Sequence, residues 1–269
     1  MKFYIKAIFW QSGFASDALH FNRTGFSIWA FTQRMSSGVD SDQGAKIDSD
    51  ANPDANPDAN LDTKPDTKST ALAGRQPEHQ RASQKAQLRR SILKARQSMP
   101  QEIWQQKSNR LCGHLQQTAW FAESRTILAY ISFRQEPDLN ALFLNHLHDR
   151  RWGLPRCVGK SLAWHLWSPE ALPLQTGTYG IPEPHPDSPM LNASEVDLIL
   201  VPAVACDVRG YRLGYGGGFY DRLLSAPAWR QIPTIGIVFE FARLPRLPIE
   251  PWDRPLQAIC TEVGLFEPR

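Results

Sequence analysis

The segment VDLILVPAVACDVRGYRLGYGGGFYDRLL, residues 196–224, decides more about this chain than any other stretch. It begins with an unbroken apolar run, Leu198 to Val201, which is typical of a strand buried on both faces of a parallel sheet. A turn at residues 207–210 and a glycine-rich loop at residues 212–218 follow, and we expect residues 219–224 to form an amphipathic helix. A glycine loop between a strand and a helix is an arrangement that binds phosphate groups.

The side chains around the glycine loop also suit a phosphate ligand. Four of the five residues at positions 214–218 are glycine, and close approach of the backbone to a ligand offsets the entropy that glycine loses on folding. Arg212 can supply a bidentate phosphate contact, and Asp221 is a carboxylate of the kind that binds Mg²⁺. The loop is neither a Walker A sequence nor GxGxxG, since Phe219 stands at the third glycine position. A plain tight turn, with Asp221 favouring the helix dipole, is the structural alternative.

The string RGYRLGYGGGFYDRLL, together with DLILVPAVACD before it, resembles the signature of the 5-formyltetrahydrofolate cyclo-ligase family. The similarity extends over residues 84–262 and includes Lys85 to Arg89, YISFRQEPD, GTYGIPEP and the C-terminal strands. The resemblance implies an enzyme that uses ATP to convert 5-formyltetrahydrofolate into 5,10-methenyltetrahydrofolate, releasing ADP and phosphate. The alternatives are a non-catalytic folate- or nucleotide-binding protein on the same scaffold and a sugar-phosphate isomerase, which would need no ATP.

The same resemblance assigns roles to individual residues. Lys85 and Arg212 are the candidate catalytic residues, and Asp221 is expected to hold Mg²⁺. The expected folate contacts are Glu136, Tyr179, Tyr215 and Phe219. The expected ATP contacts are Lys85, Arg89, Arg212, Gly214, Tyr215, Gly216, Gly217, Gly218, Phe219 and Tyr220.

Several of these positions have structural alternatives. Lys85 and Arg89 share one face of a predicted helix, but charges on such a helix usually form a solvated surface, and we expect that for its other basic residues, including Arg96. Glu136 can equally be an acid at a helix start, and Tyr179 a surface tyrosine in a turn.

The second metal ligand is uncertain from the sequence. Relatives carry an aspartate where this chain has Gln257, whose side-chain oxygen can coordinate a metal but adds no charge. Asp253 is an alternative ligand four residues earlier.

Residues 1–84 are predicted to be a disordered extension that precedes a cyclo-ligase domain at residues 85–269. Residues 36–84 contain the repeat ANPDANPDAN and almost no large apolar side chains, so they cannot bury enough surface to fold. In the domain, strands alternate with helices, which predicts three α/β/α layers around a largely parallel sheet. Strands are expected at residues 126–132, 152–156, 162–167, 198–201, 233–239 and 256–261, and helices at residues 85–99, 101–117, 137–148 and 219–224.

Composition excludes several other classes of protein. The net charge of +3 is too small to indicate a nucleic-acid partner, and no apolar run is long enough for a transmembrane helix. The four cysteines are widely spaced, which argues against a zinc site and suits a reducing compartment. We therefore expect a cytoplasmic monomer whose ligands are 5-formyltetrahydrofolate and ATP.

Overall fold

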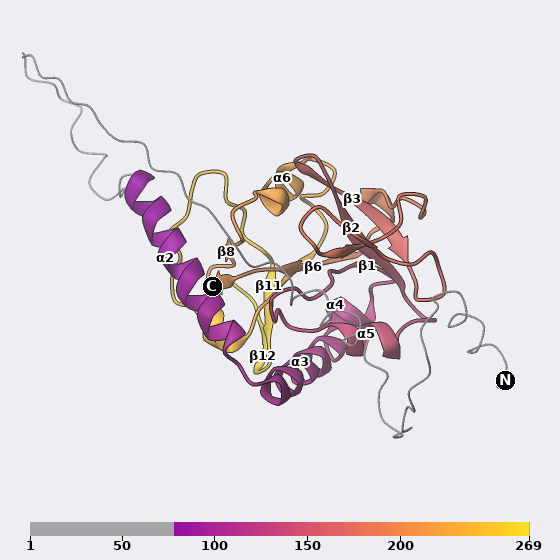
Figure 1. Cartoon of the computed structure of the whole chain (residues 1–269), viewed down its shortest axis with the longest axis horizontal. Coiled ribbons are helices and arrows are strands. Elements are labelled where there is room, and N and C mark those ends of the chain that lie inside the picture. Colours follow the sequence, from indigo (N-terminus) through magenta and orange to yellow (C-terminus); the bar gives the residue numbers. More distant parts are fainter. Residues whose placement is uncertain (1–77, 269) are drawn as a thin grey trace, which may run out of the picture. The chain divides into compact units, whose positions relative to one another are not determined.

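The computed structural model describes residues 78–268, so the expectations for residues 1–77 lie outside the described part of the chain. These residues form an α/β domain around one seven-stranded sheet with the strand order β12-β11-β9-β6-β1-β2-β3 (Figure 1). The strands are β1 (Thr126–Leu128), β2 (Arg151–Val158), β3 (Ser161–Trp167), β6 (Leu198–Pro202), β9 (Thr234–Ile237), β11 (Ala258–Thr261) and β12 (Gly264–Phe266). The helices are α2 (Glu78–Gln97), α3 (Gln101–Gln116), α4 (Ala119–Ala122), α5 (Asn140–Asn145) and α6 (Phe219–Ser225), with short 3₁₀ turns η2 (Ala193–Glu195) and η3 (Glu240–Ala242).

The central strands β11, β9, β6, β1 and β2 run parallel to one another. Only the two edge strands, β3 and β12, are antiparallel to their neighbours. The prediction of a largely parallel sheet is therefore confirmed. Two small sheets complete the domain: β7 (Ala205–Asp207), β8 (Arg212–Leu213) and β10 (Arg243–Leu244) form one, and β4 (Gln175–Thr176) and β5 (Pro182–Glu183) the other.

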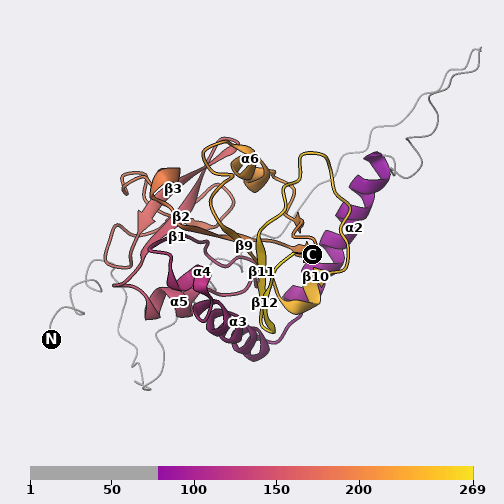
Figure 2. The ribbon, with the colours of Figure 1, turned by 180° about the vertical axis from the view of Figure 1, so that it is seen from behind.

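Two hydrophobic cores lie on the two faces of the sheet, as a three-layer domain requires. Successive side chains of a strand point to opposite faces, so Leu198 and Leu200 enter one core and Ile199 and Val201 the other. Helices α3, α4 and α5 cover the first core, and α2 and α6 contribute to the second. Figures 1 and 2 show α3, α4 and α5 together on one side of the sheet and α6 on the other.

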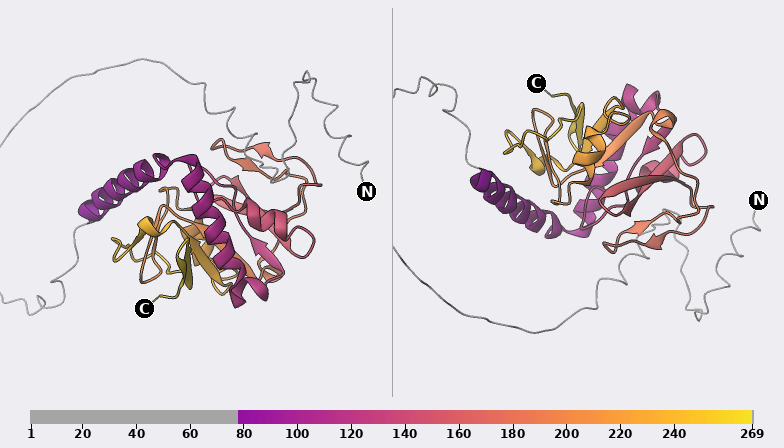
Figure 3. Two further views of the ribbon diagram at one scale, coloured as in Figure 1. Left: turned by 90° about the horizontal axis from the view of Figure 1, so that it is seen from below. Right: turned by 90° about the horizontal axis from the view of Figure 1, so that it is seen from above.

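Two elements differ from the expected boundaries in ways that matter for the site. Helix α2 begins at Glu78, seven residues before the expected domain start, and Figure 3 shows the short turn that joins it to α3. Strand β1 ends at Leu128, and the residues after it form a loop in which Arg134 and Gln135 have φ values of 49° and 54°. In the described residues, no helix is long and apolar enough to cross a membrane.

Candidate functional site

The predicted site residues converge beyond the carboxyl ends of β1 and β6, where parallel α/β sheets bind their ligands. Glu136 lies on the loop after β1, and the glycine loop lies between β8 and α6. Two contacts join these segments to each other and to α2. The Tyr215 hydroxyl donates to Glu136 Oε1 over 3.0 Å, and Arg89 Nε donates to the carbonyl of Gly214 over 2.7 Å.

The glycine loop needs glycine for its backbone shape. Gly216 has φ 108° and Gly218 has φ 68°, values that side-chain-bearing residues rarely adopt. Gly218 caps α6, and a Cβ there would lie 2.7 Å from a guanidinium nitrogen of Arg222. Because these residues have no side chains, none covers the backbone of the loop. The loop also lies close to α2, since a Cβ added at Gly216 would be 3.9 Å from Arg89 Cζ.

Three basic side chains gather beside the loop. Lys85 Nζ pairs with Asp253 over 2.8 Å, and Arg212 pairs with Asp221 over 2.5 Å. Arg89 lies within electrostatic range of both aspartates, which raise the pKa of its guanidinium, although burial has the larger effect and lowers that pKa overall. The structure thus brings together the three basic residues expected to bind phosphate, with Asp221 among them.

Arg212 and Tyr220 each have a buried polar atom without a hydrogen-bond partner among the described residues. The Arg212 side chain is only 5% exposed, and its guanidinium carbon lies 5.5 Å from the centre of the Tyr220 ring. Among residues 78–268, neither Arg212 Nε nor the Tyr220 hydroxyl has a hydrogen-bond partner. Burial also raises the pKa of the Tyr220 hydroxyl. Buried polar atoms are almost always hydrogen-bonded, so these two mark a place where a ligand can supply the partner.

Glu136 is a buried carboxylate with few compensating contacts. It is 4% exposed, and its Oε2 accepts from the Phe133 backbone amide over 3.1 Å while its Oε1 accepts from Tyr215. Burial raises the pKa of Glu136 to about 7, while Arg96 and the two hydrogen bonds act in the opposite direction. This carboxyl group therefore changes its charge near neutral pH.

Two pairs of aromatic rings lie at the glycine loop, and one of them, Phe133 with Tyr215, is next to Glu136. The ring centres of Tyr179 and Phe219 are 5.9 Å apart in an edge-to-face arrangement, and those of Phe133 and Tyr215 are 6.3 Å apart. Tyr179 is 55% exposed and Tyr215 is 40% exposed. Exposed aromatic faces beside a buried carboxylate suit a planar ring that carries hydrogen-bond donors.

The two candidates for a second metal ligand are already engaged elsewhere. Gln257 Oε1 accepts from the backbone amide of Thr234 over 2.9 Å and also from its hydroxyl, next to the first residues of β9 and β11. Asp253 accepts from Lys85 and from the backbone amide of Glu250. Within residues 78–268, no three or more His, Cys, Asp or Glu side chains are arranged to hold a metal. Asp221, which pairs with Arg212 directly before the glycine loop, is the predicted metal ligand that the structure places next to that loop in the chain fold, while Asp253 lies at the Lys85 side of the same cluster.

Arg96 was missed by the sequence reasoning, which expected it on a solvated surface. That expectation is wrong, because Arg96 is 2% exposed and its guanidinium reaches Tyr215 and two backbone carbonyls. A signal was present in the sequence. Lys85, Arg89 and Arg96 are spaced i, i+4 and i+11, which places all three on one face of a helix.

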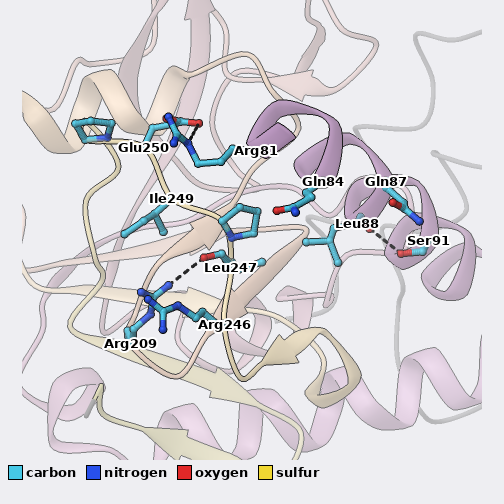
Figure 4. A pocket seen from close by; sticks show the side chains of 12 residues that line it. Arg81, Gln84, Gln87, Leu88, Ser91, Arg209, Arg246, Leu247, Ile249 and Glu250 are labelled. Carbon is cyan, nitrogen blue, oxygen red and sulfur yellow. Dashed lines mark hydrogen bonds and ion pairs between the residues drawn. The ribbon is translucent and has the colours of Figure 1, made fainter. Parts of the chain in front are cut away.

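A cavity of about 1010 Å³ lies beside the same helix. Gln84 and Leu88 on α2 face the segment that carries Leu247 and Ile249 (Figure 4). The ion pair of Arg81 and Glu250 lies at one end. Since Glu250 donates its backbone amide to Asp253, the partner of Lys85, the cavity borders the basic cluster. Its lining residues are Arg81, Gln84, Gln87, Leu88, Ser91, Arg209, Arg246, Leu247, Pro248, Ile249, Glu250 and Pro251.

Comparison with known proteins gives a consistent result. The model of the 5-formyltetrahydrofolate cyclo-ligase family matches residues 81–262. A 5-formyltetrahydrofolate cyclo-ligase of Mycolicibacterium smegmatis is 34% identical over 189 residues, which cover 66% of this chain and 93% of the relative. The solution structure of the Aquifex aeolicus 5,10-methenyltetrahydrofolate synthetase is similar with a TM-score of 0.62 and 32% identity, covering 69% of this chain and 93% of that protein. The fold is also shared with the Mycoplasma pneumoniae synthetase, at a TM-score of 0.54 and 22% identity, over 66% of this chain and 98% of that one. On its matched residues, its fold and its relatives, this chain belongs to the 5-formyltetrahydrofolate cyclo-ligase family.

Proposed function

We propose that this chain catalyses the ATP-dependent cyclisation of 5-formyltetrahydrofolate to 5,10-methenyltetrahydrofolate, with release of ADP and phosphate. One observation carries the assignment beyond family membership. The glycine loop contacts the basic cluster through Gly214 and the buried carboxylate through Tyr215, two adjacent residues. A phosphate bound on one side and a folate ring bound on the other would therefore meet at this loop.

The reaction needs positioning more than it needs a protein nucleophile. The formyl oxygen of the substrate attacks the γ-phosphorus of ATP, the bond from that phosphorus to the bridging oxygen breaks, and ADP leaves. The N10 amine then attacks the activated formyl carbon, phosphate departs with the former formyl oxygen, and the N10 proton is lost to solvent. Charge stabilisation on the transferring phosphoryl group is the main task of the protein in such a step.

We assign the phosphate contacts to Lys85, Arg89, Arg212 and the loop 214–218. Arg212 is the strongest candidate for the transferring group, because its buried Nε lacks a partner among the described residues. Lys85 and Arg89 are assigned to the other phosphate oxygens. Their present partners, Asp253 and the Gly214 carbonyl, hold the two side chains along one face of α2.

Asp221 fits the requirements of a Mg²⁺ ligand. Mg²⁺ is commonly bound by one or two carboxylates together with substrate phosphates and water, so a single carboxylate beside a phosphate site is sufficient. Asp221 is about one-third exposed and uses one oxygen for Arg212, which leaves the other oxygen for a cation. Bound Mg²⁺ would neutralise charge on the phosphate oxygens.

The folate contacts are assigned to Glu136, Tyr179, Tyr215 and Phe219. The pterin ring presents an amide N–H and an amino group on one edge, and a carboxylate can accept from both. Each Glu136 oxygen already accepts one hydrogen bond and retains capacity for another. The ring pair of Tyr179 and Phe219 would border the pterin face.

We also propose that the chain acts as a cytoplasmic monomer. All four cysteines carry free thiols, which supports a reducing compartment.

The test of the function is the absorbance of the methenyl-folate product. Purified protein, 5-formyltetrahydrofolate and Mg²⁺ are expected to give an increasing methenyl-folate band only when ATP is added. Asp221→Ala is expected to lose that increase while retaining its thermal transition. Saturable folate binding without any ATP-dependent product would instead favour a non-catalytic folate-binding protein.

The cavity beside α2 is proposed to take the nucleoside part of ATP. It combines apolar side chains such as Leu88 and Ile249 with the amides of Gln84 and Gln87, and it borders the basic cluster. A nucleobase needs this mixture of an apolar slot and a few hydrogen-bonding groups.

Filling this cavity is expected to weaken ATP binding selectively. Gln84→Trp places a large ring in the cavity and should raise the KM for ATP by about fivefold or more, with the KM for folate almost unchanged. Ser83→Trp is the matched control, because Ser83 is an exposed neighbour on α2 that does not line the cavity. Equal ATP KM values for the two variants would place the nucleoside elsewhere.

A further inference from the structure

The last turn of α2 carries a buried arginine, Arg96, that the phosphate and folate assignments leave without a role. We infer that Arg96 is a positioning residue for folate recognition. It holds the loop after β1 that carries Glu136 (the Glu136 loop) and the Tyr215 hydroxyl, so that the Glu136 carboxylate is presented to the pterin edge. The inference rests on the proposed function of the Glu136 site and adds a residue that does not itself touch substrate.

The guanidinium of Arg96 joins three separate segments. Its Nε donates to the carbonyl of Arg134 over 3.0 Å, its Nη1 to the carbonyl of Ala203 over 3.4 Å, and its Nη2 to the Tyr215 hydroxyl. Ala203 directly follows β6, Arg134 lies in the Glu136 loop, and Tyr215 lies in the glycine loop. A planar group with five fixed donors can hold all three at once, whereas a lysine ammonium cannot match that geometry.

The Glu136 loop has a backbone that needs such support. Arg134 and Gln135 both adopt positive φ, which costs a non-glycine residue roughly 1 kcal/mol or more. Three contacts from outside the loop support this conformation. Arg96 donates to the Arg134 carbonyl, Gln135 Nε2 donates to the Met99 carbonyl over 3.2 Å, and Trp104 Nε1 donates to the Glu136 carbonyl over 2.8 Å. In this conformation the Glu136 amide donates to the Phe133 carbonyl over 3.1 Å, and the Phe133 amide donates to Glu136 Oε2 over 3.1 Å.

Electrostatics around Glu136 points to the same residue. The titratable groups that act on Glu136 from the packed elements are Arg96 on α2, Tyr215 on the glycine loop, Tyr220 on α6 and Tyr130 beyond β1. The three tyrosines are neutral at neutral pH, because burial raises the pKa of each hydroxyl. The positive charge of Arg96 lowers the pKa of Glu136 against the effect of burial. Arg96 therefore favours the ionised form that accepts two hydrogen bonds.

Ionisation of Glu136 decides what the site can recognise. A carboxylate offers acceptors to both donors of the pterin edge, whereas a protonated carboxyl group places its own O–H against one of them. Removing Arg96 would raise the pKa of Glu136 further, so more of the protein would carry the protonated form near neutral pH. Folate binding would then depend on pH in a way that ATP binding does not.

The test measures KM for folate and KM for ATP separately in Arg96→Gln, from about pH 6.5 to pH 9. The folate KM is expected to rise about tenfold at neutral pH and to fall at the alkaline end as Glu136 ionises. It should stay above the wild-type value there, because the contacts of the guanidinium are lost at every pH, and the ATP KM should stay within about twofold throughout. Arg96→Lys keeps the charge and should retain most of the pH behaviour while losing part of the affinity. The matched control is Lys94→Gln, an exposed charge on the same helix.

A parallel change in both KM values, or a folate KM that is raised equally at every pH, would overturn the inference and leave Arg96 with a purely structural role. If Arg96→Gln does not fold, the comparison uses Arg96→Lys and the wild type. If the wild type binds folate without turnover, the proposed function fails, and equilibrium binding of 5-formyltetrahydrofolate over the same pH range still tests Arg96. If the wild type does not bind folate at all, both the proposed function and the role of Arg96 are contradicted.

Discussion

Replacing Arg212 with alanine is expected to reduce kcat for methenyl-folate formation by about a thousandfold. The guanidinium is almost wholly buried, its Nε has no partner among the described residues, and Asp221 fixes its orientation beside the glycine loop. A preorganised cation in a dry site stabilises developing charge far better than one in water. Because Arg212 is proposed to act on the transferring phosphoryl group, kcat should fall much more than the affinity for folate changes.

Two further variants make this result specific. Arg212→Lys keeps the charge but loses the planar fork, so it should recover only part of the activity. Arg230→Ala, which removes an exposed arginine outside the site, should behave as wild type. Steady-state kinetics with both substrates, together with thermal transitions of the three variants, separates loss of chemistry from loss of folding. A kcat within about tenfold of wild type for Arg212→Ala would exclude the assigned phosphate role.

Glu136→Gln is expected to raise the KM for folate by about a hundredfold at alkaline pH, since the amide offers one acceptor where the carboxylate offers two. In the wild type, the folate KM should rise as the pH falls through about 7, because that is where the buried carboxyl group takes up its proton. The variant cannot titrate at this position, so its folate KM should be nearly flat over the same range.

Stability measurements distinguish this loss of binding from unfolding. The pKa of Glu136 is higher in the folded protein than the usual 4.5, so ionisation costs folding stability. That cost is absent below pH 4.5 and fully present above about pH 7, where it is roughly 3 kcal/mol. Glu136→Gln removes it, so at pH 8 the variant should melt no earlier than wild type. A variant that is much less stable at that pH, or a wild-type folate KM independent of pH, would contradict this account.

The sequence was sufficient for the layers of the fold because its signals are local. The run from Leu198 to Val201 is buried on both faces, and it forms the central strand β6 between β9 and β1. Five parallel strands with helices on both faces follow from the alternation of strands and helices. The predicted helix at residues 137–148 is shorter in the structure, at Asn140–Asn145, and its predicted boundaries were wrong.

The sequence also indicated, through its family resemblance, which residues to look for in the site. Lys85, Arg89 and Arg212 do lie together beside the glycine loop, and Glu136 does meet Tyr215. Their chemical roles stay predictions until the kinetics are measured. The sequence left the second metal ligand open between Gln257 and Asp253, and the structure places the side-chain oxygen of Gln257 on Thr234.

Only the tertiary structure decided which charged side chains are buried and what they contact. Whether a helix arginine faces water or the interior depends on what packs against it, and residues 134, 203 and 215, which bind Arg96, are 38 to 119 positions away in the chain. The ionisation of Glu136 likewise depends on burial and on Arg96, which lies 40 residues earlier in the sequence. Local patterns fix the strands, the helices and the glycine loop, because those depend on neighbours in sequence. Burial and charge pairing depend on neighbours in space, which the sequence does not display.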